Sequence, residues 1–145
     1  MRWLAGLLLA LAAPSAAAPK PEAVGAAFAR IVELPGEVSL AAAVIDRREP
    51  SFFLTQKAER AMATGRPGET LSPADLVRKA HSDGPKGRVE GEQGAEGPAA
   101  VSKVWRLRTR NRRWVAMAIV WNGESARMGT LDSTAEPLLR LMRDF

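Results

Sequence analysis

Cysteine and tyrosine are absent from the 145-residue chain, and histidine occurs once. Without cysteine there can be no disulfide, no thiolate metal site and no cysteine nucleophile. One histidine without cysteine also argues against a zinc or copper site. We therefore expect no metal or other cofactor, and stability must come from a packed core, which a chain of this length can form.

The overall composition is that of an ordinary globular protein. Apolar residues make up 46% of the chain and charged residues 26%, which excludes a collagen, a coiled coil or a wholly disordered protein. The length suits one domain and is too short for two. The net charge is +5, and arginine supplies 16 of the 21 basic residues.

The first 18 residues have the pattern of a secretory signal peptide. Met1-Arg2 is a positive start, Trp3 to Ala13 is an apolar run, and Ser15 to Ala18 are small. The run is much shorter than the ~20 residues of a membrane-spanning helix. A buried N-terminal helix or an uncleaved anchor is the alternative interpretation.

Cleavage after Ala18 would leave Pro19 at the new N-terminus, a poor context, so cleavage after Ala17 is a second possibility. No cysteine follows the apolar run, which excludes a bacterial lipoprotein. We expect a periplasmic or secreted protein with no transmembrane span, in which residues 19–145 form a single domain. The oligomeric state cannot be read from the sequence.

The N-terminal half of this domain predicts a helix followed by a buried strand. Residues 22–34 carry an apolar stripe at helical spacing, and Pro35-Gly36 ends it. Residues 37–46 are apolar at alternate positions and mostly apolar between them, which is typical of a strand inside a sheet.

The next segment is ambiguous. Residues 51–63 predict a helix by the spacing of their apolar residues, and a strand at 51–56 leading into a helix is the alternative. Residues 73–81 predict a helix because Ser72 can cap it and Pro73 suits its first position. Residues 82–100 hold five glycines and two prolines, which predicts a mobile loop.

The C-terminal third predicts a hairpin and a helix. Strands are expected at 101–109 and 113–121, with a short edge strand at 125–130. The last helix is expected to begin at Asp132, with Pro137 in its first turns and a buried stripe. That stripe consists of Leu138, Leu141, Met142 and Phe145. The fold class is α+β, a small antiparallel sheet of three to five strands with N- and C-terminal helices packed on it.

Basic side chains gather in the predicted hairpin. The candidate ligand-binding residues are Lys103, Trp105, Arg106, Arg108, Arg110, Arg112, Arg113 and Trp114. Alternation along the strand predicts that Arg106, Arg108 and Arg110 share one face. Clustered guanidinium groups bind phosphate or carboxylate in bidentate fashion, and a neighbouring tryptophan can stack on bases or sugars. The alternative without a ligand is that these side chains form a solvated hairpin tip, which protects an edge strand from aggregation.

Two further features contain residue types found in catalytic sites, but neither indicates a specific reaction. His81-Ser82-Asp83 are neighbours in sequence, whereas a catalytic triad is defined by geometry. His81 could still meet Asp46, Asp132 or a distant serine. Three glutamates, Glu90, Glu92 and Glu96, lie in the predicted loop, where we expect them to be solvating charge rather than paired catalytic acids.

The order of predicted elements is similar to that of the sheet domain of penicillin-recognising serine hydrolases. Ser82-Asp83-Gly84 even matches part of their middle motif. However, no serine begins an S-x-x-K, there is no K-T-G, and the helical insertion is far too short. The likeness extends only to element order, and no residue role follows from it.

The sequence therefore favours a non-enzymatic, exported binding or assembly protein that engages an anionic partner through the hairpin. Lipid phosphate, lipopolysaccharide, an acidic polymer or an acidic protein would each supply the anion. The alternatives are a small exported hydrolase with an unassigned site and an extracytoplasmic binder of nucleic acid or another anionic polymer.

Overall fold

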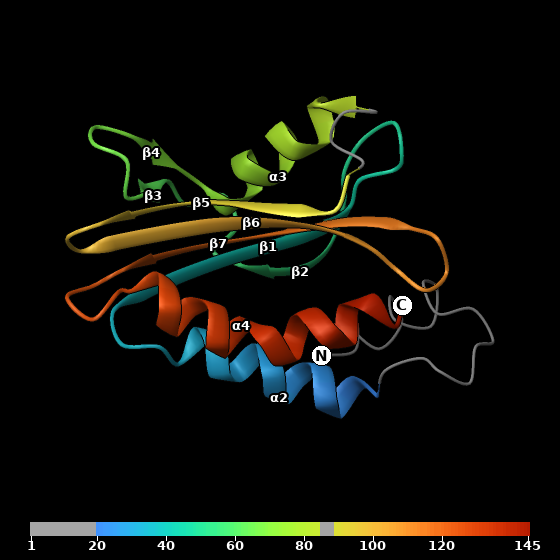
Figure 1. Cartoon of the computed structure of the whole chain (residues 1–145), viewed down its shortest axis with the longest axis horizontal. Helices are drawn as coiled ribbons and strands as arrows, with labels where there is room; N and C mark the ends of the chain where they lie inside the picture. The colour runs from blue at the N-terminus through green and yellow to red at the C-terminus, as the bar shows by residue number, and fades with distance from the viewer. Residues whose placement is uncertain (1–19, 85–88) are drawn as a thin grey trace.

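A computed structural model describes residues 20–84 and 89–145 (Figure 1). The predicted signal peptide lies outside these residues, as does the 85–88 part of the predicted loop. Within the described residues there are three helices, α2 (Pro21–Val32), α3 (Pro73–Ser82) and α4 (Met128–Arg143). None of them is long and apolar enough to cross a membrane.

The protein has the predicted α+β fold. Its sheet has five antiparallel strands in the order β2-β1-β7-β6-β5. Their bounds are β1 (Glu37–Val44), β2 (Ser51–Gln56), β5 (Gly91–Gly97), β6 (Ala100–Arg108) and β7 (Trp114–Asn122). A separate small hairpin consists of β3 (Met62–Ala63) and β4 (Thr70–Leu71). Helices α2 and α4 cover one face of the large sheet, and α3 with the small hairpin lies on the other (Figure 1).

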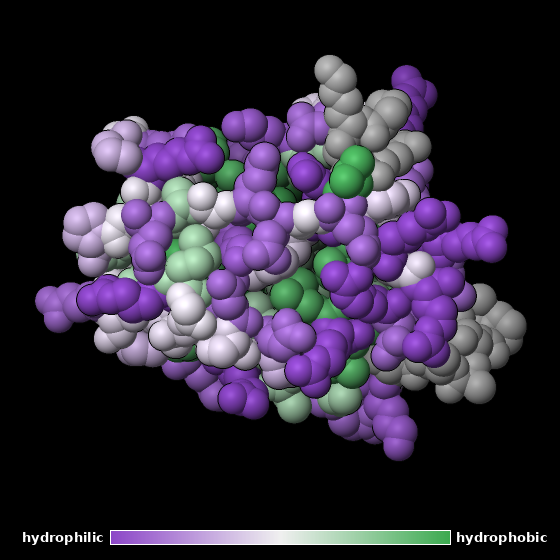
Figure 2. Space-filling view, in the orientation of Figure 1, coloured by the Kyte–Doolittle hydropathy of each residue, from purple (hydrophilic) through white to green (hydrophobic). Residues whose placement is uncertain are grey.

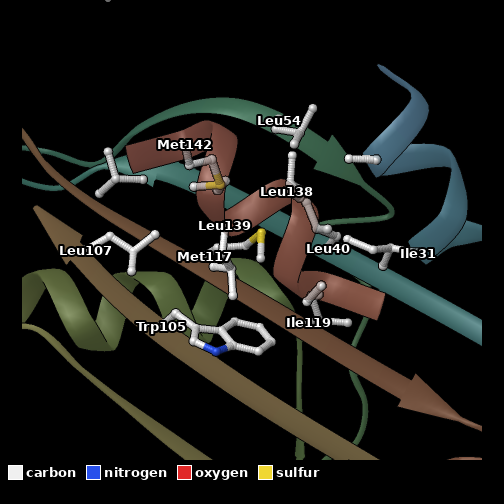
Figure 3. Packing of buried hydrophobic residues seen from close by; sticks show 14 of the residues in the cluster. Ile31, Leu40, Leu54, Trp105, Leu107, Met117, Ile119, Leu138, Leu139 and Met142 are labelled. Carbon is white, nitrogen blue, oxygen red and sulfur yellow. The ribbon is translucent and has the colours of Figure 1, made fainter. Parts of the chain in front are cut away.

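The main core lies between the sheet and the two terminal helices. Figure 3 shows Leu40, Met117 and Ile119 of the central strands facing Leu138 and Met142 of α4. All five side chains are fully buried. This packing explains why β1 and β7 are apolar on both faces, since each is central in the sheet and covered on both sides.

The opposite face is built from small residues. Ala41, Ala43, Ala116 and Ala118 are fully buried beneath α3, so the helix can approach the sheet closely. Helix α3 begins where the sequence predicts, at a capping box. The Ser72 hydroxyl accepts a hydrogen bond from the backbone N–H of Asp75 at 3.0 Å, and the Asp75 carboxylate accepts one from the backbone N–H of Ser72.

The helix predicted at 51–63 is wrong, and the strand alternative at 51–56 is confirmed as β2. Phe53 packs edge-on against Phe145 in the main core, while Phe52 lies on the α3 side. The helix expected directly after the strand does not form, and residues 62–63 belong to β3. Instead, the side chain of Asn122 bonds both backbone groups of Ala63, and buried Met62 contacts Ser39. These long-range contacts outweigh the local helix preference.

The loop predicted at 82–100 is wrong for residues 91–97, which form the edge strand β5 paired with β6 along its whole length. Backbone pairing stabilises this strand although it contains almost no apolar side chain. Gly94 is required there, because a Cβ would lie 2.7 Å from Met128 Cε and 2.9 Å from the Ser102 carbonyl oxygen. From the local sequence, Gly94 favours a loop. In the structure it lies in a strand, where the absence of a side chain allows α4 to approach the sheet.

The C-terminal segment also departs from the prediction. No edge strand forms at 125–130, because α4 already begins at Met128. The Glu96 carboxylate accepts a hydrogen bond from the backbone N–H of Met128 at 2.6 Å, so the helix is capped by a residue from β5. Pro137 consequently lies inside the helix rather than in its first turns. The predicted stripe is buried except for Leu141, which is partly buried.

Candidate anion-binding site

The turn between β6 and β7 is held by its own backbone. The N–H of Thr109 donates to the carbonyl of Arg113 at 2.8 Å, and the N–H of Arg112 donates to the carbonyl of Thr109 at 2.9 Å. Arg112 has a positive φ of 60°, which closes the turn. Thr109 is buried, whereas Arg110 and Arg112 extend into solvent.

The same turn is bonded to the C-terminal end of α4. The N–H of Arg110 donates to the carbonyl of Arg143 at 2.7 Å, and the N–H of Asn111 donates to that of Phe145 at 3.1 Å. The Arg110 guanidinium pairs with Asp144 at 3.1 Å. The basic last turn of α4, with Arg140 and Arg143, therefore lies beside the hairpin.

Together these elements form a shallow hollow, and we call this hollow, with the exposed Arg112 of the adjoining turn, the tip site. Four arginines and one carboxylate line the hollow. Its lining residues are Arg108, Thr109, Arg110, Arg140, Arg143 and Asp144. Figure 2 shows hydrophilic side chains gathered at this end of the molecule, on the right of the view. Sequence reasoning missed Arg140 and Arg143, although basic residues in a last helical turn are a recognisable signal.

The tip site contains cations that carboxylates do not fully neutralise. The Arg108 guanidinium lies 5.9 Å from the centre of the Trp114 ring. Among the described residues, neither Arg108 nor Arg112 has a carboxylate at ion-pair distance, although the charge of Arg108 helps to lower the pKa of nearby Glu90. Arg140 pairs with Glu136 at 3.2 Å, but both side chains are more than half exposed. Such a surface pair contributes only about 0–1 kcal/mol, so a bound anion could replace it.

Arg143 has a stronger partner in Glu90, at 2.5 Å. The Glu90 carboxylate also accepts a hydrogen bond from the backbone N–H of Arg108 at 3.0 Å. This N–H and the Arg143 guanidinium hold the pKa of Glu90 below its usual value. The pair connects the start of β5 to α4 and fixes one wall of the tip site.

Lys103 and Trp105 are withdrawn from the surface. Trp105 is buried in the main core (Figure 3). The Lys103 ammonium lies 2.9 Å from Glu92 and 2.5 Å from Asp132, and its side chain is only 8% exposed. Burial alone would lower the pKa of Lys103, but the two carboxylates outweigh burial and raise it. Lys103 thus joins β5, β6 and α4 and has no free face for a ligand.

Arg113 is also engaged within the fold. Its Nε and Nη2 donate to the two oxygens of Asp46 at 2.9 and 2.7 Å, and the N–H of Trp114 donates to Asp46 at 3.0 Å. Burial opposes ionisation of Asp46, but these hydrogen bonds outweigh it and lower its pKa. Trp114 itself is half-buried and packs with the residues beneath α3.

The prediction that Arg106, Arg108 and Arg110 share one face holds for Arg106 and Arg108 within β6 but is wrong for Arg110. Arg106 lies on the α3 side, where its Nε donates to the carbonyl of Val89 at 3.2 Å. Arg110 turns the other way, toward Asp144 on the α4 side. The strict alternation of a strand ends at Arg108, the last residue of β6, and the turn geometry then sets the direction of Arg110.

The three glutamates predicted to be solvating charge have specific partners. Glu90 binds Arg143 and the backbone of Arg108, Glu92 binds Lys103, and Glu96 caps α4. Each carboxylate joins the edge strand to another element. The expectation was wrong because it assumed a mobile loop over residues 82–100, whereas β5 holds Glu92 and Glu96 at fixed positions and Glu90 directly precedes it.

His81 has a structural partner as well. Its Nε2 lies 2.7 Å from the carbonyl oxygen of Arg47. Asp46, one of its possible catalytic partners, is bound to Arg113, and Asp132 is bound to Lys103. Among residues 20–84 and 89–145 no group of three His, Asp or Glu side chains is placed to hold a metal ion.

Comparisons with known proteins add little to this geometry. No family model and no curated protein matches the sequence. Among solved structures, the crystal structure of an IclR homolog from Microbacterium sp. strain HM58-2 aligns with 96% of this chain and 66% of its own, at 14% identity. The TM-score is 0.42, and we draw no functional argument from it.

Proposed function

We propose that the protein is a non-enzymatic, exported binding protein that engages a polyanionic partner through the tip site. The observation that carries this proposal is the hollow lined by four arginines and one aspartate, in which Arg140 and Arg143 have Glu136 and Glu90 as further, solvent-accessible partners. Export is supported by the charged start, the short apolar run and the small residues that follow it in the sequence.

Electrostatics favours an anionic partner at this position. Like charges held close together repel one another, and a bound polyanion relieves that repulsion. Guanidinium groups present paired N–H donors that fit phosphate, sulfate or carboxylate oxygens. Arg110, Arg112 and Arg140 are exposed, so they can rearrange around several anionic groups of one partner.

Recognition of nucleic acid by base stacking has less support. Trp105 and Trp121 are buried, and Trp114 is half-buried beside Arg108. None of these three rings is freely exposed as a platform for bases. The supported chemistry is therefore contact with a row of anionic oxygens, as in a lipid headgroup, a lipopolysaccharide, an acidic polymer or an acidic protein surface.

A matched pair of variants tests the proposal. Arg110→Gln/Arg112→Gln removes two charges at the tip site, whereas Arg60→Gln/Arg127→Gln removes two near the opposite end of the sheet. Binding to heparin, lipopolysaccharide and acidic phospholipid vesicles is measured at low salt. We expect the first variant to lose at least tenfold in affinity for the true partner class, or ~1.4 kcal/mol.

The control variant should bind within about twofold of the parent. Equal losses in both variants would show that only the net charge matters and that no site exists. Failure of the parent to bind any of the three probes would reject the proposal. The probe that binds most tightly identifies whether lipid or polymer supplies the anion, and added salt should weaken binding in either case.

A further inference from the structure

A second hollow lies on the face of the sheet opposite the main core. It has a volume of about 60 Å³ and lies between α3, the β3–β4 hairpin and strands β5 and β6. It exists because α3 packs mainly on β1 and β7 and leaves the β5 side of this face uncovered. Figure 2 shows patches of hydrophobic surface between hydrophilic side chains above β5, on this side of the sheet.

Part of the lining of this α3-side cavity is apolar, and Gln93 and Ser102 also contribute to it. Its apolar lining residues are Leu71, Leu76, Ala80, Ala95 and Val104. Val104 and Leu76 are only partly buried, so the sheet face retains apolar surface that no other element covers. A short aliphatic group would bury this surface and gain the usual hydrophobic stabilisation.

The rim of the cavity carries an excess of positive charge. Arg66, Lys79 and Arg106 lie around it together with two acidic residues, Glu69 and Asp83. Glu69 already accepts a hydrogen bond from the Thr64 hydroxyl at 2.6 Å. Arg66 and Lys79 have no carboxylate partner among the residues that the structure describes.

Arg106 is the best-placed of these cations. Its side chain is only 17% exposed, and the bond from its Nε to the carbonyl of Val89 orients the guanidinium. Its Nη1 lies 3.9 Å from Asp83, which is too long for a hydrogen bond. The terminal N–H groups therefore have a carboxylate nearby but are not bonded to it, and an incoming anion can take them.

We propose that the α3-side cavity binds a small monocarboxylate with a short aliphatic tail. The carboxylate would bind Arg106, with Lys79 and Arg66 beside it, and the tail would lie on Val104 and Leu76. A water molecule needs about 10–15 Å³ of such a volume, so the cavity has room for roughly four to six non-hydrogen atoms. Acetate, propionate and butyrate fall in this range.

This site is independent of the tip site, and its ligand is a small molecule rather than a polymer. The proposal can be tested on the full chain by titrating the ¹⁵N-labelled protein with butyrate and following backbone amide shifts. We expect saturable shifts at Ala80, Ala95 and Val104. Butylamine and 1-butanol serve as controls for charge and for tail, and both should bind at least about tenfold more weakly.

Two substitutions that remove charges of opposite sign distinguish a ligand-binding role of Arg106 from a purely structural one. Arg106→Gln should weaken butyrate binding about tenfold or more, because it removes the main charge-assisted bonds. Asp83→Asn should tighten binding, because it removes the competing carboxylate. A ligand that was instead an amine would respond to Asp83→Asn in the opposite direction.

Val104→Phe tests the cavity itself. The larger side chain should fill the space and abolish binding while the circular dichroism spectrum stays that of the parent. If that variant does not fold, Ala95→Leu is a second way to fill the cavity from β5. Arg110→Gln/Arg112→Gln should leave butyrate binding unchanged, so this test is separate from that of the tip site.

Three results would overturn the proposal. The first is an absence of shifts with millimolar acetate, propionate and butyrate. The second is binding that survives when the cavity is filled in a folded variant. The third is tighter binding of butylamine than of butyrate.

Discussion

The ion pair of Asp46 with Arg113 gives the sharpest prediction about stability. Asp46 follows β1 and joins it to the start of β7 through three accepted hydrogen bonds, two of them from one guanidinium. Its side chain is 15% exposed and that of Arg113 is 33% exposed. Asp46→Asn keeps the size of the side chain but removes its charge and one acceptor.

The expected loss follows from these contacts. Hydrogen bonds to charged groups contribute about 1.5–3 kcal/mol each, but the two from Arg113 act as one partly exposed unit. Solvent screening and the ability of Arg113 to reach water reduce the value further. We therefore expect Asp46→Asn to lower the free energy of unfolding by about 2 kcal/mol at neutral pH.

The effect should depend on pH in a defined direction. The pKa of Asp46 is lowered in the folded protein, so its contribution is complete above the unfolded value of about 3.9. As the pH falls from there through the folded pKa, both states become protonated and the contribution disappears. The difference between the parent and Asp46→Asn should therefore shrink in strong acid.

Urea unfolding followed by circular dichroism measures both effects. With a slope of about 1–3 kcal/mol per molar urea, the midpoint should fall by roughly 1 M at pH 7. Glu136→Gln is the control, since it breaks only the exposed pair with Arg140 and should cost about 0.5 kcal/mol or less. A loss for Asp46→Asn as small as that of the control would refute the reasoning, and so would a difference that persists unchanged in acid.

Four other substitutions test three features of the fold by the same unfolding measurement. Ser72→Ala removes the capping box of α3 and should cost about 1 kcal/mol; no change would mean that the cap is dispensable. Gly65→Ala should destabilise clearly more than Gly68→Ala, because a Cβ at Gly65 would meet the Ala95 carbonyl oxygen at 2.8 Å whereas that at Gly68 meets nothing within 4 Å. Lys103→Met should lower stability by about 1 kcal/mol, since it leaves Glu92 and Asp132 without their shared cation although both still reach water; an equally stable variant would contradict that role.

The elements that the sequence predicts well are those whose signals are local. Helix α3 carries its own cap in Ser72, and the hairpin shows an alternating strand, β6, and a continuously apolar strand, β7, on either side of a polar turn. By contrast, β2 is a strand because Phe53 meets Phe145, a residue 92 positions later. Strand β5 exists because β6 pairs with it, and α4 begins at Met128 because Glu96 caps it. No short window of sequence contains these partners.

In the candidate site, too, the residues that the sequence predicts are those that depend on local signals. Its exposed arginines, Arg110 and Arg112, can be found from the sequence as a run of basic residues in a turn. The burial of Lys103 in an ion pair cannot be found from the sequence, because its partner Asp132 comes from a helix far along the chain. Arg140 and Arg143 join the site only because the turn is bonded to the end of α4, which depends on the packing of the whole domain.

The contact between α2 and α4 has a consequence for the order of events during synthesis. The first described helix closes the main core only with the last one, and β1 is central only once β7 lies beside it. A growing chain that lacks α4 leaves the apolar stripe of α2 exposed, so the domain cannot close until its C-terminal residues are available. Such distant pairings are typical of domains that fold in milliseconds to seconds rather than microseconds. Helix α2, which is made before every strand of the sheet, is thus among the last elements to be buried.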